Sequence, residues 1–194
     1  MKMVKKMTCI YAVLIIAILL PSLSVNAQIE SVSVTAVQQA KSNWCWAACA
    51  EMSGKVVYSS STRTQYNVVN YLKGSLFVPY PNSTGSIEES ASGSQYVAHN
   101  TKTFTSTDSK WIFPQIESSL ADGYPVQAGA GYYTNGVRNG GHVVVIKKTE
   151  STNSNAYIDY VDPWDGATYH CSYLSFCDAS FNGRKYDQTI YVEE

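Results

Sequence analysis

Two cysteines stand four residues apart in the segment QQAKSNWCWAACAEM, which covers residues 38–52. Only a thiolate is a good nucleophile, and a free cysteine has a pKa of about 8.5, so a reactive cysteine needs surroundings that stabilise negative charge. The N-terminus of a helix offers them through unpaired N–H groups. We expect Cys45 in the first turn of a helix and Cys49, flanked by alanines, one turn further in. Cys45 is therefore the expected nucleophile, and Cys49 an expected core side chain.

A thiol nucleophile also needs a base, and the chain has three histidines. His99 lies in a polar region, and His170 lies near the end of the chain. His142 follows two glycines, which leave space beside it, and it begins an apolar segment, HVVVI, that predicts a strand. We expect His142 to be the base. The alternative is a structural histidine held by hydrogen bonds, and the glycines alone do not exclude it.

The base in turn needs an acceptor that fixes its tautomer. Asp162, in the segment YVDPW, follows a Ser/Asn turn expected around residues 150–155. If the two flanking strands form a hairpin, His142 and Asp162 lie at its open end, because they stand at similar distances along the chain from the turn. Asp159 and Asp165 are nearby alternatives. Asp162 also fits a turn residue that caps its own loop, and the pattern alone leaves both interpretations open.

The first 27 residues are typical of a secretory signal peptide. Three lysines near the start precede an apolar run over residues 9–20, and small residues at 25–27 fit a cleavage site. The alternative is a membrane anchor, but the run is shorter than the ~20 residues that a spanning helix needs. We expect a signal peptide over residues 1–27, a mature domain over residues 28–194, secretion or a periplasmic location, and no membrane association after cleavage.

The expected mature part is one weakly charged domain. Hydrophobic residues make up 45% of the whole chain and charged residues 15%, which is typical of a single domain with a core. The first 27 residues hold three of the 14 basic residues and none of the 15 acidic ones, so the remainder carries a formal charge of −4. This balance argues against a nucleic-acid partner. The oligomeric state leaves no trace in the sequence.

Helical patterns come before strand patterns along the chain. We expect helices over residues 44–57, 64–72 and 111–121, strands over residues 29–37, 124–131, 142–149, 156–164 and 186–194, and mostly loop over residues 79–109. Side chains of residues 41–43 are expected to cap the first helix. This order predicts an α+β fold, with a helical half that carries Cys45 and an antiparallel sheet that carries His142 and Asp162.

The segments QAKSNWCWAA, GGHVVVI and VDPW together resemble the papain-like cysteine peptidases. The likeness is to short bacterial members, including secreted effector proteases of plant pathogens and stand-alone relatives of bacteriocin-processing peptidases. That family has a glutamine six residues before its cysteine, which matches Gln39, and an aromatic residue after the cysteine, which matches Trp46. Its third catalytic residue precedes by two positions a tryptophan that covers the catalytic pair, which matches Asp162 and Trp164.

The resemblance implies a papain-like cysteine endopeptidase that acts on proteins or peptides without a metal or cofactor. In it Cys45 is the nucleophile, His142 the base, Asp162 the residue that orients the base, and Gln39 a donor to the oxyanion. Two features depart from the family. Ser42, Asn43 and Trp44 replace the first three residues of the CGSCW signature, and Cys45 and His142 are only 97 residues apart, so substrate preference does not carry over.

Other interpretations stay open at this point. The same fold and catalytic pair serve amidases and cell-wall peptide hydrolases. The 15 tyrosines and many polar residues also suit a secreted binding module without catalysis. A zinc site of His170, Cys171 and Cys177 lacks paired ligand spacing and a clear fourth ligand. A disulfide between Cys171 and Cys177 is compatible with an oxidising compartment.

Overall fold

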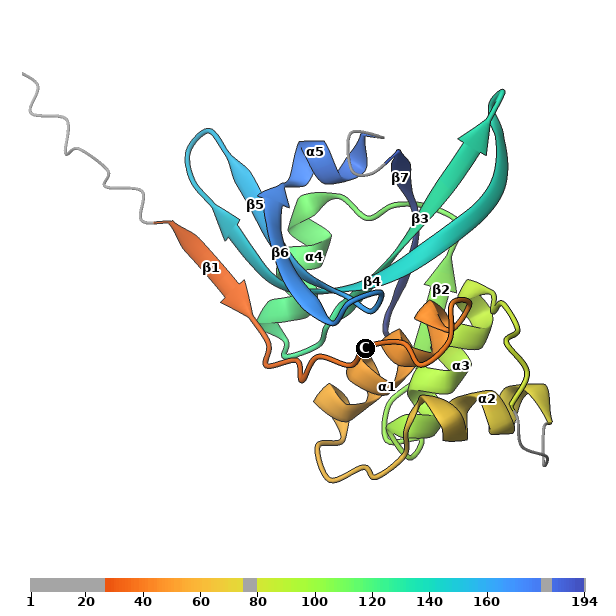
Figure 1. Cartoon of the computed structure of the whole chain (residues 1–194). Helices are drawn as coiled ribbons and strands as arrows, with labels where there is room; N and C mark the ends of the chain where they lie inside the picture. The colour runs from red at the N-terminus through yellow and green to blue at the C-terminus, as the bar shows by residue number, and fades with distance from the viewer. Residues whose placement is uncertain (1–26, 75–79, 179–182, 194) are drawn as a thin grey trace, which may run out of the picture.

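The computed structural model describes residues 27–74, 80–178 and 183–193 and shows two halves stacked on each other (Figure 1). One half holds three helices, α1 (Cys45–Val57), α2 (Gln65–Lys73) and α3 (Ile87–Val97). The other half is a bent antiparallel sheet with two further helices, α4 (Phe113–Ala121) and α5 (Tyr173–Cys177). Of the expected signal peptide, only Ala27 falls within the described residues.

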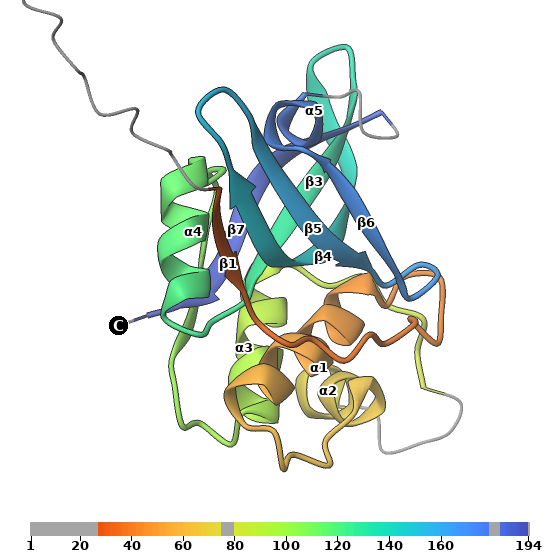
Figure 2. The same ribbon diagram turned by 90° about the vertical axis from the view of Figure 1, so that its left-hand side faces the viewer.

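The sheet has the strand order β2-β7-β3-β4-β5-β6, and β1 pairs with β4 off this path. The strands are β1 (Gln28–Ser31), β2 (Phe104–Thr107), β3 (Val126–Thr134), β4 (Val137–Ser151), β5 (Ala156–Asp162), β6 (Ala167–Ser172) and β7 (Arg184–Val192). Every pairing is antiparallel. Figure 2 shows α4 lying beside β1 and β7, above the three helices of the other half.

Helix α1 is the central element because both of its sides are buried. Ala47 and Ala50 pack toward α2 and α3, in a cluster with Val68 and Val97. Cys49 and Met52 face the sheet, in a cluster whose other members include Val143, Val145 and Val161. Small side chains suit this position, since α1 approaches α3 closely at Gly54, where an added Cβ would lie 2.5 Å from the Cβ of Val97. The helix that begins at Cys45 is thus fixed between the two halves.

All three expected helices are present. Helices α1, α2 and α4 begin within two residues of the predicted starts, at Cys45, Gln65 and Phe113. The predicted loop over residues 79–109 is wrong, because it contains α3 and β2. Within the described part of the chain, none of the helices has both the length and the apolar character needed to cross a bilayer.

A capping motif marks the start of α3, although the amino-acid composition of this segment is typical of a loop. Ser86 accepts a hydrogen bond from the backbone of Glu89, and the Glu89 side chain accepts one from the backbone of Ser86. This capping box defines a helix start. The three serines, one alanine and one glycine of α3 resemble loop composition, but small residues are needed here because Gly93 packs against Val68 and Ala50 of the neighbouring helices.

The predicted turn of the hairpin is confirmed, because β4 ends at Ser151 and β5 begins at Ala156. The strand expected over residues 29–37 is shorter, since only Gln28–Ser31 pairs with β4. Strand β6 and the short helix α5 were not expected. In the register of the hairpin, Val145 faces Val161, which brings the middle of β4, at His142, close to the end of β5, at Asp162.

Candidate active site

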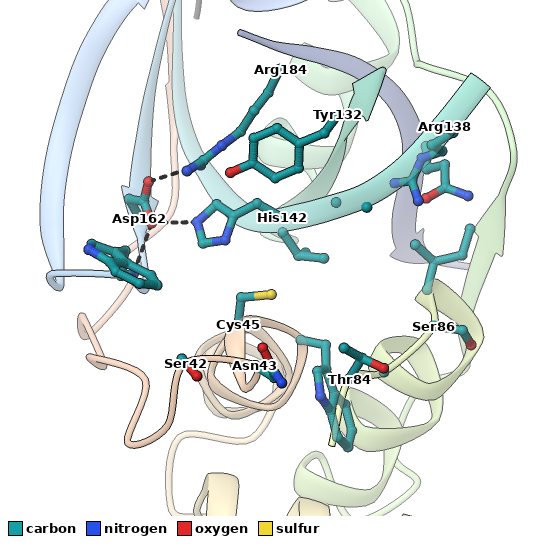
Figure 3. Close-up of a pocket in the computed structure, with 18 of the residues that line it drawn as sticks. Ser42, Asn43, Cys45, Thr84, Ser86, Tyr132, Arg138, His142, Asp162 and Arg184 are labelled. Carbon is teal, nitrogen blue, oxygen red and sulfur yellow. Dashed lines mark hydrogen bonds and ion pairs between the residues drawn. The ribbon is translucent and has the colours of Figure 1, made fainter. Parts of the chain in front are cut away.

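Cys45 is the first residue of α1, and it lies partly exposed where the helical half meets the sheet (Figure 3). Trp44 is the N-cap residue, and its side chain makes no capping hydrogen bond within the described part of the chain. The expected capping by residues 41–43 is therefore wrong. Asn43 instead donates its backbone N–H to the side chain of Asn82, 3.0 Å, and its amide to the Asn82 carbonyl, 2.9 Å. The uncapped end leaves the Trp46 N–H to hydrogen-bond the sulfur of Cys45.

His142 and Asp162 meet as the hairpin predicted. The Nε2 atom of His142 lies 2.6 Å from Oδ1 of Asp162, and both side chains are buried. The backbone N–H of Trp164 donates to the same oxygen at 2.8 Å, which holds the carboxylate in place. Because Nε2 is engaged, the other ring nitrogen, Nδ1, is left for the hydrogen bond with Cys45.

The two competing aspartates are engaged elsewhere. Asp159 accepts a hydrogen bond from Nδ1 of His170 at 2.6 Å, on the exposed side of β5 and β6. Asp165 accepts from the N–H of Ala167 at 2.9 Å and from the hydroxyl of Tyr169 at 2.5 Å. Of the three candidates only Asp162 lies beside His142.

The surroundings of Cys45 favour its thiolate. Burial raises the pKa of the thiol, but the hydrogen bond with His142, the charge of His142 and the N–H groups of Val143 and Trp46 outweigh burial, so the pKa falls below its ordinary value. Burial lowers the pKa of His142, but hydrogen bonds and charges from Asp162 and Cys45 raise it to about 9. The two shifts favour a thiolate and an imidazolium side by side.

Cys49 has the opposite environment. It is fully buried, and its thiol donates to the carbonyl of Val143 at 3.2 Å. Burial raises the pKa of Cys49 well above its ordinary value, and the neighbouring charges of Cys45 and Asp162 raise it further. The expectation that Cys49 is a buried core side chain is confirmed. Cys171 and Cys177 are both free thiols in the structure.

Gln39 lies near the site but does not point into it. Its amide nitrogen donates to the carbonyls of Lys41, 2.9 Å, and Ser42, 2.8 Å. Its amide oxygen is buried and has no hydrogen-bond partner among the described residues. In this arrangement Gln39 fixes the loop before α1, and donation to a substrate oxygen requires one of these bonds to open.

A cavity of about 890 Å³ opens in front of Cys45 and His142. Its wall on the helical side includes Thr84, Gly85 and Ile87, and its wall on the sheet side includes Tyr132, Arg138, Trp164, Tyr169 and Arg184. Trp46 is buried as expected, beneath Gly85. Trp164 also lines this cavity and is 59% exposed, and its backbone N–H secures Asp162, so the expected cover of the catalytic pair by its ring stays a prediction.

Comparisons with known proteins show the family and the fold of the chain. Residues 31–190 match the model of the Peptidase_C39 like family. Among solved structures, digestive procathepsin L 3 of Tenebrio molitor aligns with a TM-score of 0.52 and 11% identity over 85% of this chain and 67% of that one. A structure from a study of the mite allergens Blo t 1 and Der p 1 aligns with a TM-score of 0.55 and 10% identity over 91% of this chain and 74% of that one. A search of the curated proteins returns no match.

Identities this low show the fold alone, and that fold is the papain-like fold of cysteine peptidases. The expected α+β architecture, with the cysteine on a central helix and the histidine on the sheet, is confirmed. Two site features had no signal in the motifs: the guanidinium of Arg184 beside Asp162, and Asn82 as the partner of the loop before α1.

We expect iodoacetamide to modify Cys45 at pH values below the thiol pKa of about 8.5 that is usual for a free cysteine. In His142→Ala the burial of Cys45 persists while its partner is lost, so the rate at pH 7 should fall by about tenfold or more. The measurement is the pH dependence of alkylation, located by peptide mass spectrometry. His170→Ala is the matched control, since His170 also pairs with an aspartate but far from Cys45. Equal pH dependence in parent and His142→Ala would contradict the pairing.

Proposed function

Because the chain belongs to the Peptidase_C39 like family and is a cysteine peptidase, we propose that it is an endopeptidase whose catalytic residues are Cys45, His142 and Asp162. The observation that carries the proposal is the hydrogen bond of 2.6 Å between His142 and Asp162, placed directly above a cysteine at a helix N-terminus. The cavity of about 890 Å³ in front of Cys45 has room for part of a peptide, and both walls carry side chains that can contact it.

In the first step the Cys45 thiolate attacks the carbonyl carbon of the scissile peptide bond. The His142 imidazolium then gives its Nδ1 proton to the amide nitrogen, the C–N bond breaks, and the amine leaves. Cys45 is now a thioester. In the second step neutral His142 takes a proton from water, the hydroxide attacks the thioester, and the acid product leaves while the thiolate and imidazolium are restored. Every proton is held by these groups or by water, so neither step needs a metal or a cofactor.

Asp162 acts on the base and not on the substrate. By accepting from Nε2 it keeps the tautomer that presents Nδ1 to Cys45. Burial raises the pKa of Asp162, but the hydrogen bond and charge of His142, the Trp164 N–H and the charge of Arg184 lower it overall. The carboxylate therefore stays ionised throughout the cycle and stabilises the imidazolium.

We assign the oxyanion to two donors, the Cys45 backbone N–H and the Gln39 side-chain amide. The first residue of a helix has no intrahelical partner for its N–H, so the Cys45 N–H is available. Gln39 contributes after one amide hydrogen turns from the Ser42 carbonyl to the substrate oxygen. The buried, unsatisfied amide oxygen of Gln39 favours such a rearrangement, because the present arrangement leaves a polar atom without compensation.

Residues 1–27 direct the protein out of the cell in this proposal, and the mature protein begins at Gln28. The formal charge of −4 that remains suits a protein or peptide partner better than a nucleic acid. A mature protein that still carried residues 1–27, as seen by intact mass, would contradict this part of the proposal.

Protein comprising residues 28–194 should cleave unfolded proteins at internal peptide bonds and form a covalent adduct with an epoxysuccinyl inhibitor on Cys45. The products are read by mass spectrometry, with purified cell wall as the second substrate. Cys45→Ala should abolish both cleavage and adduct, whereas Cys171→Ser should leave both. Soluble fragments released from cell wall alone would identify a cell-wall peptide hydrolase, and the lack of any adduct or product would contradict catalysis by Cys45.

Gln39→Ala should lower kcat about 100-fold with a smaller change in KM, because it removes one of two donors to a charge that exists only in the transition state. Gln38→Ala is the matched control, since Gln38 hydrogen-bonds the Trp164 carbonyl and lies one residue away. Steady-state kinetics on a peptide taken from the cleavage products gives both constants. A lower thermal midpoint with unchanged kcat would show that Gln39 only fixes the loop of residues 41–43.

A further inference from the structure

Arg184 is the first residue of β7, and its guanidinium lies between an aromatic ring and the catalytic carboxylate (Figure 3). The Cζ atom of Arg184 stands 5.1 Å from the ring centroid of Tyr132, and its Nη1 atom stands 3.8 Å from Oδ2 of Asp162. His142 and the Trp164 N–H use the other carboxylate oxygen, Oδ1. Arg184 therefore approaches the face of Asp162 that the catalytic hydrogen bonds leave open.

The sheet register explains how Arg184 is held there. Tyr132 on β3 is the cross-strand partner of Arg184 on β7, so their side chains lie on the same face of the sheet. The partner of Tyr132 on the other side is Gly140 on β4, which has no side chain to compete for the space. The ring and the guanidinium form a cation–π contact, which stabilises the guanidinium at this partly buried position.

Burial of the Arg184 guanidinium is energetically unfavourable, which indicates that its charge has a function. The Nε and Nη1 atoms of Arg184 are buried and have no hydrogen-bond partner among the residues that the structure describes. Buried unsatisfied donors are destabilising, so packing alone favours an apolar residue at this position. Arg138 in the same cavity is different, because it makes a close ion pair with Asp187 at 2.9 Å and is more exposed.

We propose that Arg184 is a positioning residue that balances the charge of the catalytic group through Asp162. This inference rests on the proposed function. A thiolate, an imidazolium and a carboxylate carry a net charge of −1, and the guanidinium brings the buried group to neutrality. A neutral group is easier to keep out of water than an anionic one. Loss of Arg184 thus makes a second anion, the Cys45 thiolate, harder to form next to Asp162.

The test is the pH dependence of Cys45 alkylation by iodoacetamide in Arg184→Met, Arg184→Lys and the parent. We expect the pH of half-maximal rate to rise by about 0.5 to 1 unit in Arg184→Met, with most of the rise reversed in Arg184→Lys, which restores the charge. Lys185→Met is the matched control, because it removes the same charge from the next, exposed residue of β7. A purely structural role lowers the thermal midpoint without moving the pH of half-maximal rate.

An unshifted midpoint in a folded Arg184→Met, or an equal shift in Lys185→Met, overturns the proposal. If Arg184→Met does not fold, Arg184→Gln serves in its place, since it keeps a polar side chain and lacks the charge. A change in KM for acidic peptides with no shift in the pH midpoint would instead identify Arg184 as a contact for substrate and also overturn the proposal. A parent protein without any thiolate at neutral pH contradicts the proposed function itself, so the two failures are distinguishable.

Discussion

The proposed chemistry of Cys45 depends on the hydrogen bond between Nε2 of His142 and Oδ1 of Asp162, which is 2.6 Å long. It fixes the imidazole orientation, and so decides which ring nitrogen faces the sulfur. The bond depends on the register in which β4 and β5 pair near Val145 and Val161, because a slip of one strand by one residue would turn its side chain to the opposite face of the sheet from that of its partner. The packed valines of that hairpin, including Val145 and Val161, hold the register. The core of the sheet thus sets the geometry of the site.

The second requirement is that Cys45 and His142 remain charged although both are removed from water to a large extent. A thiolate next to the apolar core is unfavourable unless several positive groups face it. The uncapped N-terminus of α1, the N–H groups of Val143 and Trp46, and the His142 ring supply this stabilisation for Cys45. One turn later the same helix supplies none of it to Cys49, whose pKa is raised by burial. We therefore expect the two cysteines on this helix to differ in reactivity, with Cys45 the more reactive.

Much of this arrangement could be predicted from the sequence. The periodicity of α1, the turn between β4 and β5, and the glycines before His142 are local signals, and they placed three side chains correctly relative to one another. Local signals failed where long-range packing decides. Helix α3 is built from small residues because Gly93 packs close to α1 and α2, and its composition looks like loop. Arg184 reaches Asp162 only through the pairing of β7 with β3, which no short motif records. No short motif predicts the exposure of Trp164 or the hydrogen bonds from the Gln39 amide to the loop before α1.

The charge state of His142 in the resting protein tests the central claim most directly. We would record ¹⁵N spectra of histidine-labelled protein from pH 5 to pH 10 and assign His142 with a His142→Gln variant. The account predicts that both ring nitrogens of His142 stay protonated through neutral pH and lose a proton near the pKa of about 9 that its partners impose. They should do so earlier in Cys45→Ala, which lacks the thiolate. Titration of His142 near the ordinary histidine value of about 6.5, with no response to Cys45→Ala, would contradict the charged pair.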